Sequence, residues 1–98
     1  MPYYTYIATN SGKTTLYTGV TGDLSLRAFQ HANKVTAGFT SRYNVNRIVW
    51  YDIFDNPYDA IAAEKRIKGW RREKKLELIK SKNPKFLDLL NEDAEDPS

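Results

Sequence analysis

The sequence contains no cysteine and one histidine, His31. The absence of cysteine excludes disulfide bonds and thiolate chemistry, and one histidine cannot build a zinc site of histidine and cysteine ligands. Any resident metal must therefore be a hard cation held by carboxylates. No apolar run is long enough to span a bilayer, and the first residues lack the basic and apolar regions of a secretory signal. We expect a cytoplasmic protein that does not enter a membrane.

The 98 residues suffice for one compact domain and leave no room for a second core. We expect residues 1–90 to form that domain and residues 91–98, which carry four acidic residues and no basic one, to be a disordered tail. Without those four carboxylates the formal net charge of +3 becomes +7, and ten of the fifteen lysines and arginines lie between Lys65 and Lys85. This concentration suits a polyanion such as nucleic acid, although a solvated helical face would show the same pattern.

Two β-rich segments, residues 3–9 and 14–20, flank turn-forming residues at 10–13 and predict a β-hairpin. A two-residue turn at the centre of this connection would place Tyr6 directly opposite Tyr17. The two tyrosines would then share one face of the sheet. Considered alone, two such tyrosines are more commonly an ordinary aromatic cross-strand pair than part of a functional site.

The rest of the chain predicts one more strand and several helices. A helix begins at the N-cap Asp23 and ends near residue 33, and the polar residues 34–46 are interpreted as a loop. The apolar run 47–54 is typical of a strand covered on both faces, so we expect it to be the central strand. Further helices begin at Tyr58, after Trp70 and, for a short last helix, at Pro84. The predicted fold class is α/β of the α+β type: a small three-stranded antiparallel sheet flanked by helices in the order β-β-α-β-α-α, with a short C-terminal helix.

Two charged residues lie beside apolar helical stripes. Arg27 lies near the face of the first helix that must pack on the hairpin, either as a structural cation or as a guanidinium aimed at phosphate. Glu64 follows Ala63, one member of the stripe of the next helix. A carboxylate near a core needs a cation, so we expect either a basic side chain or a metal ion beside Glu64.

Five elements in this order resemble the signature of the GIY-YIG nuclease family. They are the two tyrosine motifs Tyr4-Thr5-Tyr6 and Tyr17-Thr18-Gly19, then Arg27, His31 and Glu64. The match looks closest to small stand-alone bacterial proteins related to the nuclease domain of the excision-repair endonuclease. Two features depart from the pattern: Tyr4 replaces a glycine, and the asparagine that follows the glutamate in several branches has no clear equivalent.

The resemblance implies an endonuclease that hydrolyses a nucleic-acid phosphodiester, with DNA in repair or recombination as the expected substrate. A single Mg²⁺ or Mn²⁺ would be bound through Glu64, because one carboxylate cannot hold two metal ions. Tyr6 or Tyr17 would position or deprotonate the attacking water, and the resemblance favours Tyr17 with Tyr6 and His31 around it. Arg27 would pair with a nonbridging phosphate oxygen.

Basic residues would hold the phosphate backbone without reading its sequence. Those expected to do so are Lys34, Lys65, Lys68, Arg71, Arg72, Lys74 and Lys75. We expect a monomer whose specificity is weak, directed by substrate structure or supplied by a protein partner. Two alternatives stay open: a catalytically silent nucleic-acid-binding module of the same fold, and a protein-interaction domain.

Overall fold

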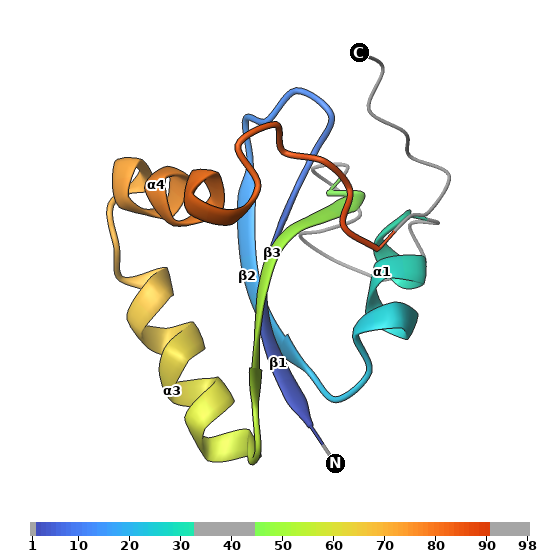
Figure 1. Cartoon of the computed structure of the whole chain (residues 1–98), viewed down its shortest axis with the longest axis vertical. Coiled ribbons are helices and arrows are strands. Elements are labelled where there is room, and N and C mark those ends of the chain that lie inside the picture. The colour runs from blue at the N-terminus through green and yellow to red at the C-terminus, as the bar shows by residue number, and fades with distance from the viewer. Residues whose placement is uncertain (1, 33–44, 91–98) are drawn as a thin grey trace.

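Three antiparallel strands form one sheet in the order β2 (Leu16–Thr21), β1 (Tyr3–Thr9) and β3 (Arg47–Phe54) (Figure 1). The computed structural model describes residues 2–32 and 45–90, with the backbone alone at 31 and 32. The strands and helices in this part of the chain are β1 (Tyr3–Thr9), β2 (Leu16–Thr21), α1 (Leu24–Ala32), β3 (Arg47–Phe54), α3 (Pro57–Lys68) and α4 (Arg72–Lys82). The order β-β-α-β-α-α and the antiparallel sheet confirm the predicted fold class.

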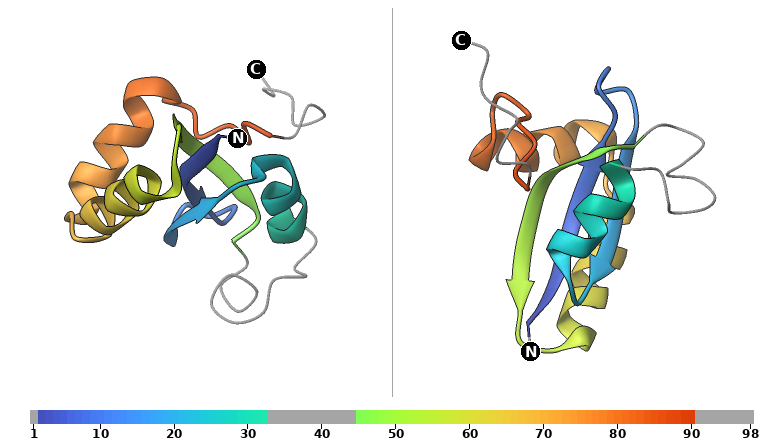
Figure 2. Two further views of the ribbon diagram at one scale, coloured as in Figure 1. Left: turned by 90° about the horizontal axis from the view of Figure 1, so that it is seen from below. Right: turned by 90° about the vertical axis from the view of Figure 1, so that its right-hand side faces the viewer.

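β1 lies in the middle of the sheet, with α1 over one face and α3 and α4 over the other (Figure 2). Residues 5–9 of β1 are consequently all buried. The prediction that the strand 47–54 is central is wrong, because this strand, β3, pairs with β1 and lies at an edge of the sheet. Its second half leaves the core, and the Ile53 side chain is 56% exposed.

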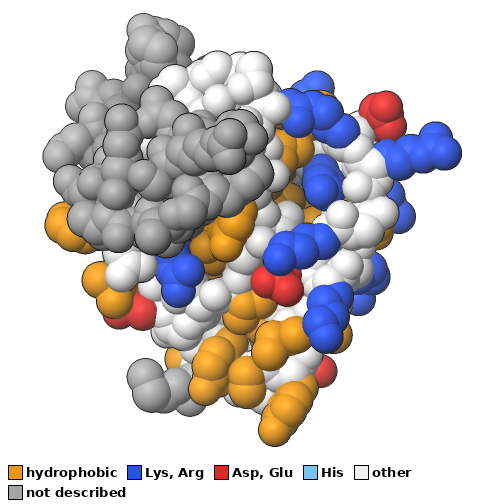
Figure 3. Space-filling view, turned by 180° about the vertical axis from the view of Figure 1, so that it is seen from behind, with side chains coloured by type: hydrophobic (Ala, Val, Ile, Leu, Met, Phe, Trp, Pro, Cys, Tyr) orange, Lys and Arg blue, Asp and Glu red, His pale blue; other side chains and the backbone are white. Residues whose placement is uncertain are grey.

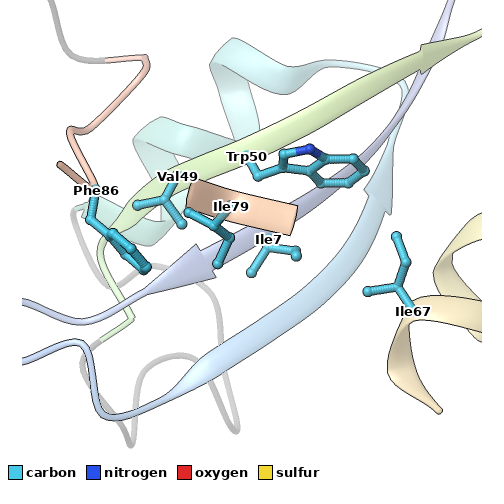
Figure 4. Packing of buried hydrophobic residues seen from close by; sticks show 6 residues of the cluster. All are labelled: Ile7, Val49, Trp50, Ile67, Ile79 and Phe86. Carbon is cyan, nitrogen blue, oxygen red and sulfur yellow. The ribbon is translucent and has the colours of Figure 1, made fainter. Parts of the chain in front are cut away.

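A bulge explains why β3 reads as a continuous apolar run. Ile7 of β1 pairs with Trp50, but the next residue, Ala8, pairs with Ile48, so Val49 is an extra residue in β3. Ile48 therefore packs on the α1 side, whereas Val49 and Trp50 both join the cluster beneath α3 and α4 (Figure 4). The run of apolar residues reflects this bulge and not a central position in the sheet.

The hairpin between β1 and β2 has a longer turn than the two-residue turn predicted from the sequence. The Asn10 side chain accepts hydrogen bonds from the backbone N–H groups of Thr14 (2.9 Å) and Thr15 (3.2 Å), which organises a wider loop. The register is consequently shifted by two residues, and Tyr6 lies opposite Gly19 and not opposite Tyr17. A two-residue shift keeps every side chain on its face, so the two tyrosines still share one side of the sheet.

Local capping fixes where the helices beside the sheet begin. The Asp23 carboxylate accepts from the Leu26 N–H at 3.0 Å, as predicted for the N-cap of α1. Asn56 caps α3 in the same way, by accepting from Asp59 N–H at 2.9 Å. The hydroxyl of Thr5 donates to the Ala60 carbonyl at 2.6 Å, which joins α3 to the central strand.

The predicted short helix at 84–90 does not form, and these residues make turns along β3. Phe86 has a φ of 55°, a left-handed conformation that interrupts a helix. The buried Asn83 amide donates to the carbonyls of Val49 (3.0 Å) and Leu87 (2.8 Å), and the Leu89 N–H donates to Ile48 (2.9 Å). The segment therefore covers part of the β3 edge instead of adding a helix.

Two interpretations fall outside the described residues: the loop at 34–46, apart from its last two positions, and the tail at 91–98. The division into a domain and a tail accordingly stays a prediction. Within the described residues, no helix is long and apolar enough to cross a membrane.

Candidate active site

Gly19 gives the Tyr6 ring room to lie across β2. A Cβ atom placed on Gly19 would lie 2.6 Å from the Tyr6 hydroxyl oxygen and 2.7 Å from the adjoining ring carbon. Real Cβ atoms do not approach so closely, so any larger residue at position 19 would displace the ring. The absence of a side chain at this position therefore lets a buried residue of the central strand reach across the neighbouring strand.

Tyr17 lies beside Tyr6 on the same face, two residues before Gly19 in β2. The two ring centroids are 6.2 Å apart, and the ring planes meet at 43°. Tyr6 is fully buried, whereas Tyr17 is half-buried at the edge strand. Of the two phenols, Tyr17 is thus the more accessible to a substrate or a water molecule.

Arg27 of α1 forms a hydrogen bond with the Tyr6 hydroxyl and influences its pKa. Burial raises the pKa of the Tyr6 hydroxyl above its ordinary value, and the neighbouring Tyr17 and the negative charge of Glu64 raise this pKa further. The charge of Arg27 and a hydrogen bond from its side chain lower the pKa but do not reverse the effect. Tyr6 therefore stays protonated at neutral pH and acts as a hydrogen-bonding group, not as a base.

Glu64 of α3 completes the group from the other side of the sheet. Its side chain is 19% exposed, and its carboxylate lies 3.6 Å from the Lys68 ammonium, one helical turn away. The carboxylate is near enough to Tyr6 to raise the pKa of that hydroxyl. Residues from β1, β2, α1 and α3 thus meet at the β2 edge, which Figure 3 faces.

The basic residues predicted to bind nucleic acid differ in their exposure to solvent and in their contacts. Most of them are exposed on α3, α4 and the connection between these helices: Lys65, Lys68, Arg71, Arg72 and Lys74; Lys75 is half-buried. Two make additional contacts, since Arg72 donates to the Lys13 carbonyl at 2.8 Å and the Lys74 ammonium lies 4.2 Å from the centre of the Trp70 ring. Figure 3 shows that lysine and arginine side chains line this side of the molecule.

Two predicted site residues are described by the structure only in part or not at all. The roles of two further residues were not predicted from the sequence. The backbone of His31 belongs to the last turn of α1, and Lys34 falls outside the described residues. Arg66, exposed on the last turn of α3, belongs with the basic side chains and was detectable from its position next to Lys65. The steric role of Gly19 was not detectable, since it follows from the register of the hairpin.

The carboxylate of Glu64 suits a single hard cation. No group of three or more histidine, cysteine, aspartate or glutamate side chains gathers in the described part of the chain, which argues there against a cage built from protein ligands alone. Mg²⁺ commonly uses one or two carboxylates and completes its shell with water and substrate phosphate. Glu64, whose side chain is 19% exposed and whose charge acts on the Tyr6 hydroxyl, fits that donor set.

Residues 2–77 match the family model of the GIY-YIG catalytic domain, and this span contains all of the side chains that meet at the β2 edge. The chain belongs to the GIY-YIG family. The resemblance inferred from the tyrosine motifs, Arg27, His31 and Glu64 is thereby confirmed. A GIY-YIG domain places the protein in a family of nucleases, which are hydrolases.

Several small proteins are also similar to this chain in sequence or in structure. The chain is 36% identical over 64 residues to a UPF0213 protein of Staphylococcus saprophyticus, an alignment that covers 65% of this chain and 78% of the relative. A UPF0213 protein of Clostridium perfringens is 37% identical over 70 residues, with 71% and 75% covered. The solution NMR structure of a UPF0213 protein from Bacillus halodurans superposes with a TM-score of 0.56 at 29% identity, covering 88% of this chain and 90% of that one.

The departure at Tyr4 from the GIY-YIG pattern has a local structural effect. Tyr4 lies one position before the buried Thr5 and pairs with Thr21 on one side and Ile53 on the other. Its ring packs edge-on against Tyr51 of β3, with centroids 6.2 Å apart and planes at 75°. Tyr4 therefore packs toward β3 and leaves the Tyr6 ring its path across Gly19.

Proposed function

We propose that this protein is a divalent-metal-dependent endonuclease that hydrolyses a phosphodiester bond in nucleic acid, with DNA in repair or recombination as the substrate. The observation that carries the proposal is the meeting of Tyr6, Tyr17, Arg27 and Glu64 at one sheet edge. As separate features, a buried tyrosine, an inward arginine and a half-buried glutamate each cost stability. A single phosphodiester-cleaving site accounts for all of them.

Glu64 would hold the metal ion, and Lys68 would keep the carboxylate oriented while no metal is bound. When bound, Mg²⁺ or Mn²⁺ supplies charge neutralisation at the scissile phosphate and at the leaving oxygen. The Lys68 side chain is 53% exposed, so solvent weakens this ion pair and the pair would not prevent metal binding.

Tyr17 would hold the attacking water in line with the phosphate or, once its own hydroxyl proton has passed to solvent, accept a proton from that water as a phenolate. Tyr6 cannot take this role at neutral pH because burial raises its pKa and keeps it protonated. The Tyr6 hydroxyl accepts a hydrogen bond from Arg27, so it would be held in place to orient the water or its neighbour Tyr17. Proton transfer at Tyr17 would be assisted by the positive charges around the site.

Arg27 would bind a nonbridging oxygen of the scissile phosphate. A guanidinium has five N–H donors in a planar fork, so its hydrogen bond to Tyr6 uses only part of its capacity. The same contact fixes the direction of the fork before the substrate arrives. Charge that develops on the phosphate oxygens would then meet a donor that needs no further reorganisation.

The test is cleavage of labelled branched, nicked, flapped and single-stranded substrates in Mg²⁺ or Mn²⁺. Glu64→Ala should lower the cleavage rate by about 100-fold or more, since the charge that the metal neutralises is worth several kcal/mol. Glu77→Ala, which removes an exposed glutamate of α4, is the matched control and should cut like the wild type. If neither wild type nor variant cuts any substrate while both bind equally, the protein is a binding module of the same fold.

A further inference from the structure

Charged side chains are distributed unevenly along the molecule. The hairpin turn and α4, with the last turn of α3, carry most of the described lysines and arginines. The opposite end consists of residues 2–6, 20–24 and 51–63, which lie together at the lower end of Figure 1. This acidic end contains four aspartates and no lysine or arginine: Asp23, Asp52, Asp55 and Asp59. One flank of the candidate active site is therefore basic and the other acidic.

The exposed side of α3 runs from the acidic end to the basic residues and passes next to Glu64. Tyr58, Ile61, Lys65 and Lys68 follow one another at intervals of three or four residues, so they form one row along the helix. The row begins with Tyr58, which is 81% exposed, and Ile61, which is 40% exposed. It ends at Lys68, which is ion-paired with Glu64. Figure 3 shows the hydrophobic side chains gathered at the lower end of this face, below the basic ones.

We propose that Tyr58 and Ile61 contact the bases of an unpaired stretch of the substrate strand, on the flank of the scissile phosphate that faces the acidic end. This inference rests on the proposed function and names its substrate class: nucleic acid that is unpaired on one side of the cut. Lysines of α3 and α4 hold phosphates on the other flank.

The negative charge of the four aspartates opposes the binding of phosphate groups on the acidic flank. A duplex running across that end would bring the phosphates of two strands toward four carboxylates, at distances where repulsion is only partly screened. A single strand can instead turn its phosphates to water and its bases toward the protein. An exposed tyrosine ring offers a flat surface on which any base can stack, and Ile61 extends it with an apolar contact.

The test measures binding in a Glu64→Ala background, so that cleavage cannot alter the probe. The ligands are a blunt DNA duplex and the same duplex with a single-stranded overhang that carries 2-aminopurine. We expect tighter binding of the overhang substrate and a change in 2-aminopurine fluorescence. Adding Tyr58→Ala should weaken binding of the overhang substrate by about 5- to 150-fold and abolish most of the fluorescence change, with little effect on the blunt duplex.

Three variants separate stacking from other effects. Tyr58→Phe keeps the ring and should bind like its parent, and Ile53→Ala removes another exposed apolar residue of the acidic end, outside α3, and should do the same. Ile61→Ala provides a second loss on the same row should Tyr58→Ala fail to fold. Lys65→Ala should reduce the slope of the logarithm of the binding constant against the logarithm of the salt concentration by about one. Tyr58→Ala should leave that slope unchanged.

Two results would overturn the inference. Equal losses for blunt and overhang substrates would assign Tyr58 to general binding or to folding. No loss for either substrate would assign this surface to a protein partner. The experiment measures binding and not cleavage, so its outcome is independent of the proposed nuclease activity. If the protein binds the overhang more tightly through Tyr58 but cuts no substrate, this inference holds and the proposed nuclease activity is refuted.

Discussion

The two faces of the sheet use the same strands for different purposes. Beneath α3 and α4 the buried cluster is made of large apolar side chains: Ile7, Val49, Trp50, Ile67, Ile79 and Phe86. Beneath α1 the cluster contains Tyr6 and packs against three further tyrosines: Tyr4, Tyr17 and Tyr51. The first face stabilises the fold through packing, whereas the second carries the hydroxyl groups of Tyr6 and Tyr17 to the β2 edge. Substitutions on the two faces should therefore separate stability from activity.

The largest effect on stability is expected at Ile79, the one fully buried residue of α4. Ile79→Ala should lower the free energy of unfolding by about 2–5 kcal/mol, because it removes methyl groups from a close-packed cluster and leaves a cavity. Urea denaturation measures this loss. At a temperature where the variant is folded, the cleavage rate should stay near that of the wild type; a large loss of activity in the folded variant would show that the two faces are not separable.

Gly19 offers the reverse experiment on the other face. Gly19→Ala should reduce cleavage by about 100-fold, since the added methyl group would displace the Tyr6 hydroxyl from its site and small displacements of catalytic groups have effects of this size. Gly22→Ala is the matched control, because a Cβ there would lie at an ordinary 3.7 Å from Tyr3. Should both alanine variants cut equally well, the crossing of Tyr6 over Gly19 would have no role in catalysis.

The smallest effect is a dependence of stability on alkaline pH that originates at Tyr6. Its pKa is raised in the folded protein, chiefly by burial, so the folded state retains a proton that the unfolded chain loses above pH 10. The contribution of Tyr6 is fully present below pH 10 and declines as pH rises, by up to about 1.4 kcal/mol per pH unit. Urea denaturation from pH 9 to 11 should show a steeper decline for wild type than for Tyr6→Phe. Parallel curves would show that Tyr6 is not held protonated by the fold.

Much of the fold follows from patterns that act over a few residues. Asp23 as an N-cap and Ala63 as part of the apolar stripe of α3 were both predicted, because capping and helical periodicity depend on near neighbours. The errors have a different origin. The hairpin register depends on how Asn10 organises the turn, and the place of β3 in the sheet depends on which strand pairs with which.

By itself, the sequence determined the family, since the spacing of the two tyrosine motifs, Arg27 and Glu64 identified it without any coordinates. Only the tertiary structure decided how these residues meet. Tyr6 reaches the β2 edge because it pairs with Gly19, and Glu64 approaches it from α3 on the opposite face. The physical reason is that motif spacing is a property of one chain segment, whereas a catalytic arrangement arises from steric and electrostatic contacts between segments distant in sequence.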